Sequence, residues 1–184
     1  MSREEREEGE GLVRTLKLSG RLKKEHRRGW VIKVGIPDPE SVADHSFRTA
    51  LIAMLLGDSR GLDTGKMMRM ALIHDLGEAI IGDLTPLDIA KLETKKHDET
   101  EAIEEIFSTL PKQLREKYLH LWRELRDGSS EEAKLVSDAD KLEMALQASE
   151  YEKEGYPKEM LSEFKASAIK RTYDKEILNI IHNL

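Results

Sequence analysis

Helix-breaking residues divide the sequence into segments whose apolar residues recur at helical spacing. Leu114, Tyr118, Leu121, Trp122 and Leu125 show this spacing clearly, since residues three and four positions apart share one face of an α-helix. Glycine or proline borders most of these segments, and both disfavour helix interiors. Strand-like alternation is nearly absent. The pattern therefore predicts an all-α bundle, and a length of 184 residues suits one domain.

The segments between these breaks predict the order of the helices. We expect a first helix within 12–22, a second from Pro39 to about Leu56, and a central helix from Asp63 or Thr64 to Ile80 or Ile81. Further helices are expected over 91–110, 111–127 and 129–153, and a single final helix follows from Pro157.

Local signals refine these boundaries. Asp38 can cap the second helix with Pro39 in its first position. Ser129 and Glu132 have the spacing of a capping box. Residues 30–34 are the one β-like run. Because two prolines follow it closely, we interpret it as an extended loop.

A histidine and an aspartate lie side by side within an apolar run. Leu72, Ile73 and Leu76 favour burial, which would carry His74 and Asp75 toward the interior. A buried carboxylate is costly unless it is paired or bound to metal. Imidazole and carboxylate together are common ligands of divalent metals. Glu78 is expected on the same helical face, so three functional groups would converge.

Two further residues on other predicted helices are candidate ligands. His45 precedes the His-Asp pair and Asp140 follows it. With His74 and Asp75 they could complete a metal centre from three helices, although spacing alone does not show that they meet. Asp138, close to Asp140, is an alternative.

The composition excludes several classes of protein. The absence of cysteine excludes disulfides, thiolate zinc sites and cysteine catalysis. A net charge of −6 argues against a general nucleic-acid binder. The longest apolar run, 50–56, is too short to cross a membrane, and residues 1–10 are unlike a signal peptide, so we expect a cytoplasmic protein. Scarce Asn and Gln beside abundant Lys and Glu are typical of a thermophile.

Three segments, in order, resemble the signatures of the HD-domain hydrolases. They are PESVADHSFRTA (39–50), ALIHDLGEAIIGDLTP (71–86) and DADKLEMALQASEYE (138–152). The resemblance covers about residues 21–151. Within the family, these segments resemble the 5′-deoxynucleotidase branch more specifically. The resemblance implies one HD domain over 1–184, with the C-terminal helix packed on the core. It also implies a divalent cation such as Co²⁺, Mn²⁺ or Mg²⁺, and a homodimer.

The resemblance also assigns the metal ligands. His45, His74, Asp75 and Asp140 match the family's ligand positions. Asp140 is preferred to Asp138 because a segment like KLEM follows the family's aspartate.

The resemblance further assigns catalytic and substrate-contacting residues. Glu78 and Asp83 match an essential acidic pair, which can position water or shuttle its proton. RRGW matches a substrate-contacting Arg and Trp, here Arg28 and Trp30, although Arg27 is an alternative. An arginine can bind phosphate bidentately. Trp30 would exclude a 2′-hydroxyl, or else simply pack in the core.

These assignments favour a metal-dependent phosphohydrolase that cleaves deoxynucleoside 5′-monophosphates. A dNTP triphosphohydrolase would want more basic residues around its pocket, and a phosphodiesterase remains a further alternative. A di-iron oxygenase would need His97 and His120 as ligands, whereas their neighbours indicate a solvated face and a packing role. The alternative that is not an enzyme is a regulatory protein that binds nucleotides without hydrolysing them.

Overall fold

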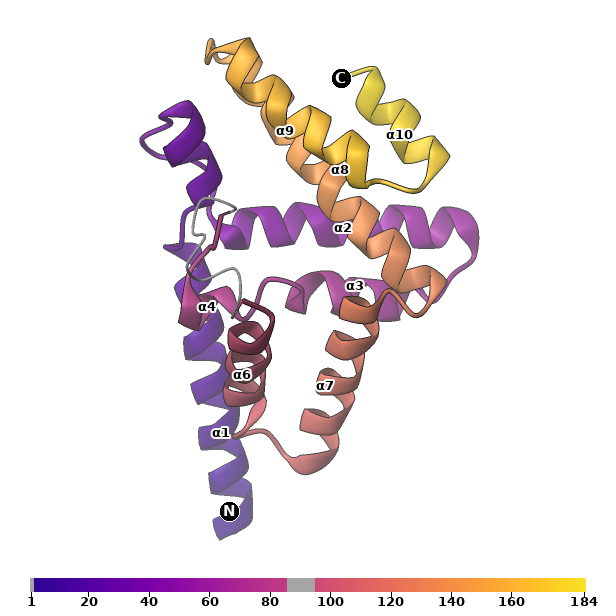
Figure 1. The fold of residues 1–184 in the computed structure, drawn as a ribbon. Helices are drawn as coiled ribbons and strands as arrows, with labels where there is room; N and C mark the ends of the chain where they lie inside the picture. Colours follow the sequence, from indigo (N-terminus) through magenta and orange to yellow (C-terminus); the bar gives the residue numbers. More distant parts are fainter. Residues whose placement is uncertain (1, 86–94) are drawn as a thin grey trace.

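The centre of the fold is a pair of antiparallel helices crossed by a third. In the computed structural model, which describes residues 2–85 and 95–184, α2 (Val42–Arg60) and α3 (Thr64–Ile73) run in opposite directions, and α8 (Glu131–Lys153) crosses them (Figure 1). Met67 and Met70 of α3 are fully buried, as are Ala133 and Ala139 of α8. This crossing forms the core of an all-α bundle, as the sequence predicts.

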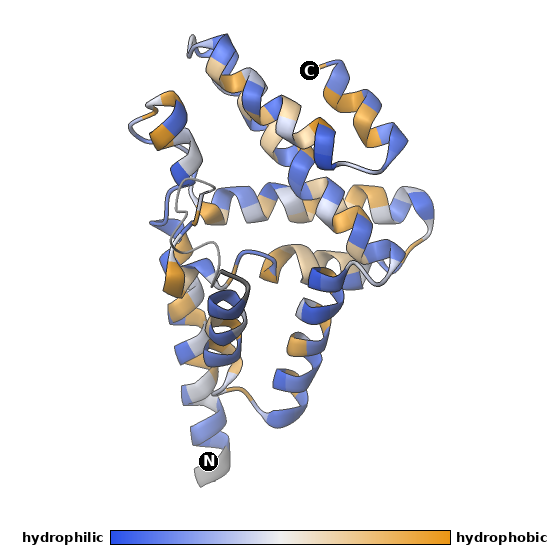
Figure 2. Cartoon of the chain, in the orientation of Figure 1, coloured by the Kyte–Doolittle hydropathy of each residue, from blue (hydrophilic) through white to orange (hydrophobic). Residues whose placement is uncertain are grey.

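The remaining elements pack at the two ends of this crossing. α1, α4, α6 and α7 lie toward the end of the molecule where the chain begins. α9 and α10 pack against α8 at the opposite end of the molecule (Figure 1). Orange and blue positions alternate along these helices, as amphipathic helices require (Figure 2). Their bounds are α1 (Arg3–Ser19), η1 (Gly20–Lys23), η2 (Trp30–Val34), α4 (Glu78–Ile81), α6 (Lys95–Phe107), α7 (Lys112–Asp127), α9 (Lys158–Arg171) and α10 (Lys175–His182). Residues 91–94 of the helix expected over 91–110 lie outside the described residues.

Two predicted helix starts are wrong by a few residues. Ser41, not Asp38, caps α2: its hydroxyl accepts the N–H of Asp44 at 3.2 Å, and the Asp44 carboxylate accepts the N–H of Ser41 at 2.9 Å. Ser130, not Ser129, caps α8 by accepting the N–H of Ala133 at 3.1 Å. In each case a serine later in the sequence than the expected cap satisfies a free N–H group of the first turn. α2 also continues past Leu56 to Arg60.

The β-like run 30–34 is a turn of π-helix and not an extended loop. Trp30 and Val34 are buried, while Val31 and Ile32 between them are exposed. A helical turn gives this spacing, whereas a strand would place Ile32 on the same face as Trp30 and Val34. Gly35 ends the turn with φ 80° and donates its N–H to the carbonyl of Val31 at 3.1 Å. This left-handed conformation favours glycine.

The central helix is interrupted at its functional residues. α3 ends at Ile73, and residues 74–77 form a turn before α4. The N–H of Glu78 bonds to the carbonyl of Asp75 at 3.0 Å, which is i→i+3 spacing and not α-helical spacing. Glu78 therefore does not share a continuous helical face with His74. Leu72 is 53% exposed, against expectation, and Ile73 and Leu76 supply the burial.

The predicted final helix is two helices, α9 and α10. The carboxylate of Asp138 accepts the N–H of Tyr173 at 3.2 Å and that of Asp174 at 2.8 Å. Asp174 in turn caps α10 by accepting the N–H of Ile177 at 3.0 Å. These carboxylates satisfy N–H groups that a continuous helix would use internally, so the chain turns at 172–174.

Across 2–85 and 95–184, none of the helices has both the length and the apolar character needed to cross a bilayer.

Candidate metal centre and adjoining cavity

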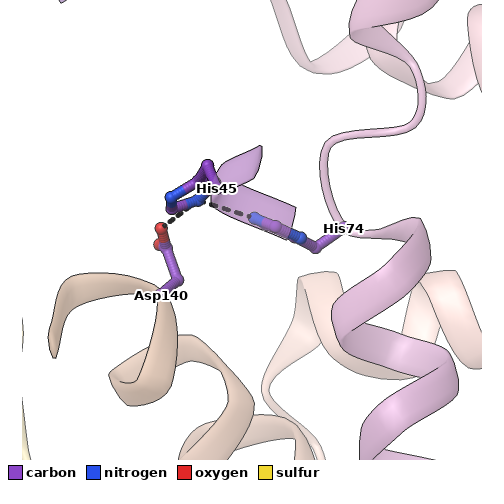
Figure 3. Close-up of side chains that lie close together, drawn as sticks. All are labelled: His45, His74 and Asp140. Carbon is purple, nitrogen blue, oxygen red and sulfur yellow. Dashed lines mark hydrogen bonds and ion pairs between the residues drawn. The ribbon is translucent and has the colours of Figure 1, made fainter. Parts of the chain in front are cut away.

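Three of the predicted ligands meet around one imidazole. His45 projects from α2 and is completely buried. Its Nε2 atom lies 3.2 Å from Nε2 of His74 and 3.2 Å from Oδ1 of Asp140 on α8 (Figure 3). These side chains place their ligand atoms within 4.8 Å of one another, so residues far apart in sequence converge at one point.

Asp75 completes the cluster. Its Oδ2 atom lies 3.1 Å from Nε2 of His74 and 3.7 Å from Nε2 of His45. The turn at 74–77 presents His74 and Asp75 together at the end of α3, so these two sequence neighbours both reach the cluster. All four predicted ligands are therefore brought together, from α2, the turn after α3, and α8.

Both histidines are oriented from the side opposite the cluster. Nδ1 of His74 lies 2.6 Å from the carbonyl of Ala71, which can only accept a hydrogen bond. The proton is therefore on Nδ1, and the Nε2 lone pair points at the cluster. Nδ1 of His45 contacts the buried carboxylate of Glu143. Such partners commonly orient metal-binding imidazoles.

Charge complementarity holds the cluster together. Burial and the nearby Arg27 both lower the pKa of His45, but hydrogen bonds to Asp140 and Glu143 outweigh them and raise it to about 10. Burial acts to raise the pKa of Asp75 and Asp140, yet the histidines hold both below the usual range. The carboxylate and imidazole donors lie close enough together to bind a divalent cation. The positive charge of the cation would replace the charge of the protons that the imidazoles carry.

A cavity of about 300 Å³ adjoins the cluster. Asp75 and Asp140 of the cluster line it, as do the buried carboxyl residues Glu78 and Asp83. Basic and aromatic side chains form much of the remaining wall. They are Arg27, Trp30, Lys33, Phe164 and Arg171.

Arg27 reaches the cluster, whereas Arg28 turns toward the loop beside it. The guanidinium of Arg27 lies 3.1 Å from Oδ2 of Asp75 and lines the cavity. Arg28 donates its backbone N–H to the Asp83 carboxylate at 2.6 Å and its guanidinium to the Asp83 carbonyl at 3.2 Å. Of the two arginines, Arg27 lines the cavity, whereas the Arg28 that the motif suggests does not.

Trp30 lines the cavity but is only 1% exposed. Its ring stacks on Phe164 with centroids 4.1 Å apart, and its indole N–H donates to Glu40 at 2.9 Å. Burial, assisted by Glu143, raises the pKa of Glu40 to about 7. Trp30 thus has a packing role in the structure, while its proposed contact with a sugar remains a prediction.

Two groups of residues around the site were not identified from the sequence. Glu143 lies within the KLEM segment and could have been found from its place on the buried face of α8. Phe164, Ser167 and Arg171 line the cavity from α9. Their helical spacing gives no signal by itself, because it indicates only a shared face.

His97 and His120 lie outside the cluster. Their side chains are 73% and 80% exposed, and each approaches a glutamate of its own helix, Glu101 at 3.2 Å and Glu124 at 3.9 Å. These positions offer no support for the oxygenase alternative.

Comparison with known proteins agrees with this architecture. Residues 19–180 match the family model described as HD domain, so the chain belongs to the HD-domain family. A mouse relative named 5′-deoxynucleotidase HDDC2 is 42% identical over 176 residues, which cover 96% of this chain and 87% of the mouse protein. A Dictyostelium discoideum protein of the same name is 44% identical over 145 residues, 75% of this chain and 76% of that protein. The predicted family is thereby confirmed.

The fold is also similar to solved structures. A conserved hypothetical protein from Pyrococcus furiosus is 38% identical and superposes with a TM-score of 0.79. The alignment covers 94% of this chain and 99% of that chain. The PH0347 protein from Pyrococcus horikoshii is likewise 38% identical and superposes with a TM-score of 0.77. The alignment covers 93% of this chain and 96% of that chain.

The cluster predicts the outcome of removing one ligand at a time. His74→Ala and Asp140→Ala should each lose the bound divalent metal, because each removes a donor atom from the cluster. Elemental analysis of the purified variants measures this. Asp138→Asn is the matched control, since Asp138 bonds to backbone N–H groups at 172–174. It should keep the metal but lose roughly 1–3 kcal/mol of unfolding free energy. Full metal occupancy in both ligand variants would contradict the assignment.

Proposed function

We propose that this protein is a metal-dependent 5′-deoxynucleotidase, which hydrolyses deoxynucleoside 5′-monophosphates to nucleoside and phosphate. The observation that carries the proposal is the His-Asp cluster opening onto a cavity that also contains Arg27 and two buried acidic residues. Relatives named 5′-deoxynucleotidase, similar over most of their length, support the same substrate class. Such free nucleotides fit a cytoplasmic location, which we also propose.

His45, His74, Asp75 and Asp140 would hold the metal, for which we propose Co²⁺, Mn²⁺ or Mg²⁺. When bound, the cation would supply a water of lowered pKa and neutralise phosphate charge. The chain's own task is then to orient the phosphate. Arg27 already lies beside Asp75 and lines the cavity. Its planar guanidinium can offer paired donors to two phosphate oxygens.

Glu78 and Asp83 are proposed to act on the attacking water and on the leaving oxygen. Both side chains are 8% exposed and line the cavity. The loop around Asp83 is fixed at two points, because its carboxylate accepts the N–H of Arg28 and its own N–H donates to Glu25 at 3.2 Å. A carboxylate held in this way can accept a proton from water or return one to the sugar oxygen.

Removing the charge of either acidic residue should separate catalysis from metal binding. Glu78→Gln and Asp83→Asn keep the side-chain shape but cannot take up the proton. We expect them to retain the metal and to lose about 10²–10⁴-fold in kcat, measured with dAMP as substrate. Loss of the metal along with activity would make these residues ligands, and near-normal turnover would remove them from the mechanism.

The substrate assignment makes a prediction for each arginine. Wild-type protein should release phosphate from dAMP, dGMP, dCMP and TMP faster than from the matching ribonucleotides. Arg27→Ala should lower kcat/KM for all of them by about 10–100-fold, the scale of a lost hydrogen bond to a charged group. Arg28→Ala should cost less, because its guanidinium binds a backbone carbonyl. The sugar preference should weaken in Trp30→Phe, which preserves an aromatic ring in the core.

Product analysis separates the alternatives. Triphosphate released from dATP would indicate a triphosphohydrolase, and cleavage of a phosphodiester would indicate a phosphodiesterase. Tight nucleotide binding with no released phosphate would indicate a regulator. An equal or greater rate with AMP than with dAMP would contradict the deoxynucleotide preference, and a larger loss in Arg28→Ala than in Arg27→Ala would restore the motif-based assignment.

We also propose a homodimer formed through the outer face of α2. Phe47, Leu51 and Leu55 are 70%, 41% and 59% exposed and follow one another at one-turn intervals. An apolar stripe of this kind is typical of an interaction surface. Phe47→Glu should convert a dimer to a monomer in light scattering coupled to size exclusion. Leu12→Glu, on the exposed side of α1, is the control and should stay dimeric. A monomeric wild type would end the proposal.

A further inference from the structure

Glu143 is a fully buried carboxylate that none of the proposed catalytic steps uses. It projects from α8 and contacts Nδ1 of His45, the ring nitrogen that faces away from the cluster. We infer that Glu143 is a positioning residue, which with Arg48 fixes the ring orientation and tautomer of His45 for metal binding. The inference rests on the proposed metal site and assigns a role to a residue outside its ligand set.

Arg48 holds Glu143 in place on the side away from His45. The Nε and Nη2 atoms of Arg48 lie 3.0 and 2.9 Å from Oε1 of Glu143, while Oε2 of Glu143 contacts His45. Arg48 is itself restrained by Glu150 at 2.7 Å and by Gln147 at 2.6 Å. Each oxygen of Glu143 therefore has a separate partner, and the carboxylate cannot rotate without losing one of them.

The two histidines of the cluster are oriented by different means. His74 donates to the carbonyl of Ala71, one turn earlier in its own chain segment, so its orientation follows from the backbone. His45 has a side-chain partner from another helix. The position of His45 relative to Asp140 consequently depends on the ion pair between Arg48 of α2 and Glu143 of α8.

The geometry excludes Glu143 from the same coordination sphere as the cluster. Its carboxylate contacts Nδ1, whereas Asp140 and His74 approach Nε2 on the opposite edge of the ring. An imidazole thus separates Glu143 from the ligand atoms. A buried carboxylate is also a poor choice for stability alone, because apolar replacement of a buried ion pair is often neutral or stabilising. Orienting the ligand accounts for the charge.

Glu143→Gln is the sharpest test, because the amide cannot satisfy both partners. If its oxygen faces His45, its NH₂ group faces the donors of Arg48. If it flips, NH₂ faces Nδ1 and drives the proton to Nε2, where the lone pair is required. We expect the dissociation constant for Co²⁺, measured by calorimetry on the metal-free protein, to rise about 10–100-fold. The d–d absorption bands of the Co²⁺ form should shift as the ligand geometry changes.

Two further variants separate positioning from packing. Glu152→Gln removes a carboxylate charge from the same helix as Glu143, where it pairs with Lys158 and Lys165 and not with Arg48, so it should bind Co²⁺ like wild type. The double variant Arg48→Met/Glu143→Leu leaves no unpaired buried charge, so it should fold as thermal unfolding reports, yet still bind Co²⁺ more weakly. It tests the inference even if Glu143→Gln does not fold.

The outcomes are distinct. Weakened binding and shifted bands in the folded Glu143 variants, with Glu152→Gln unchanged, support the inference. A dissociation constant within twofold of wild type in the double variant overturns it, whatever the change in stability, and leaves the proposed function intact. A wild-type protein that binds no Co²⁺ at this cluster overturns both.

Discussion

The structure depends on the need to pair buried charges at the crossing of α2, α3 and α8. His45 is completely buried among the carboxylates of Asp75, Asp140 and Glu143. The side chains of His45 and Glu143 are both fully buried and would not be stable there without partners, because an unpaired buried charge is expensive. Packed Met and Ala side chains bring the helices close enough for the charges to meet. The apolar core and the polar cluster therefore require each other: one supplies the approach, and the other fixes which residues face inward.

Much of this arrangement could be predicted from sequence, because helical periodicity and ligand chemistry are local properties. The all-α class, the start of α3 at Thr64 after its cap Asp63, and the buried stripe of Met67 and Met70 follow from local sequence signals. What failed was the path of the chain where tertiary contacts overrule local preference. Residues 30–34 look like a strand but form a helical turn, which buries Trp30 and Val34 and leaves Ile32 between them exposed. The last helix breaks because Asp138, distant in sequence, binds its backbone.

The same distinction applies to the site. The motifs bring His45, His74, Asp75 and Asp140 together correctly, and their roles as ligands remain predictions. The choice between Arg27 and Arg28 could not be made from two adjacent arginines in the sequence. It depends on which guanidinium reaches Asp75 and which one binds the loop at Asp83. The positioning of His45 depends on an ion pair between α2 and α8, and periodicity places both residues on helices without showing that they touch.

The wall that α9 contributes to the cavity has a consequence for how such proteins diversify. Phe164, Ser167 and Arg171 lie beyond the three signature segments, yet they face the same space as the cluster. Substitutions there leave the four proposed ligands untouched, so the shape of the cavity can change without altering its chemistry. A domain trimmed at the end of the last signature would retain every motif and lose part of its binding surface. Comparisons restricted to the signatures would then group proteins by reaction and miss differences in what each one accepts.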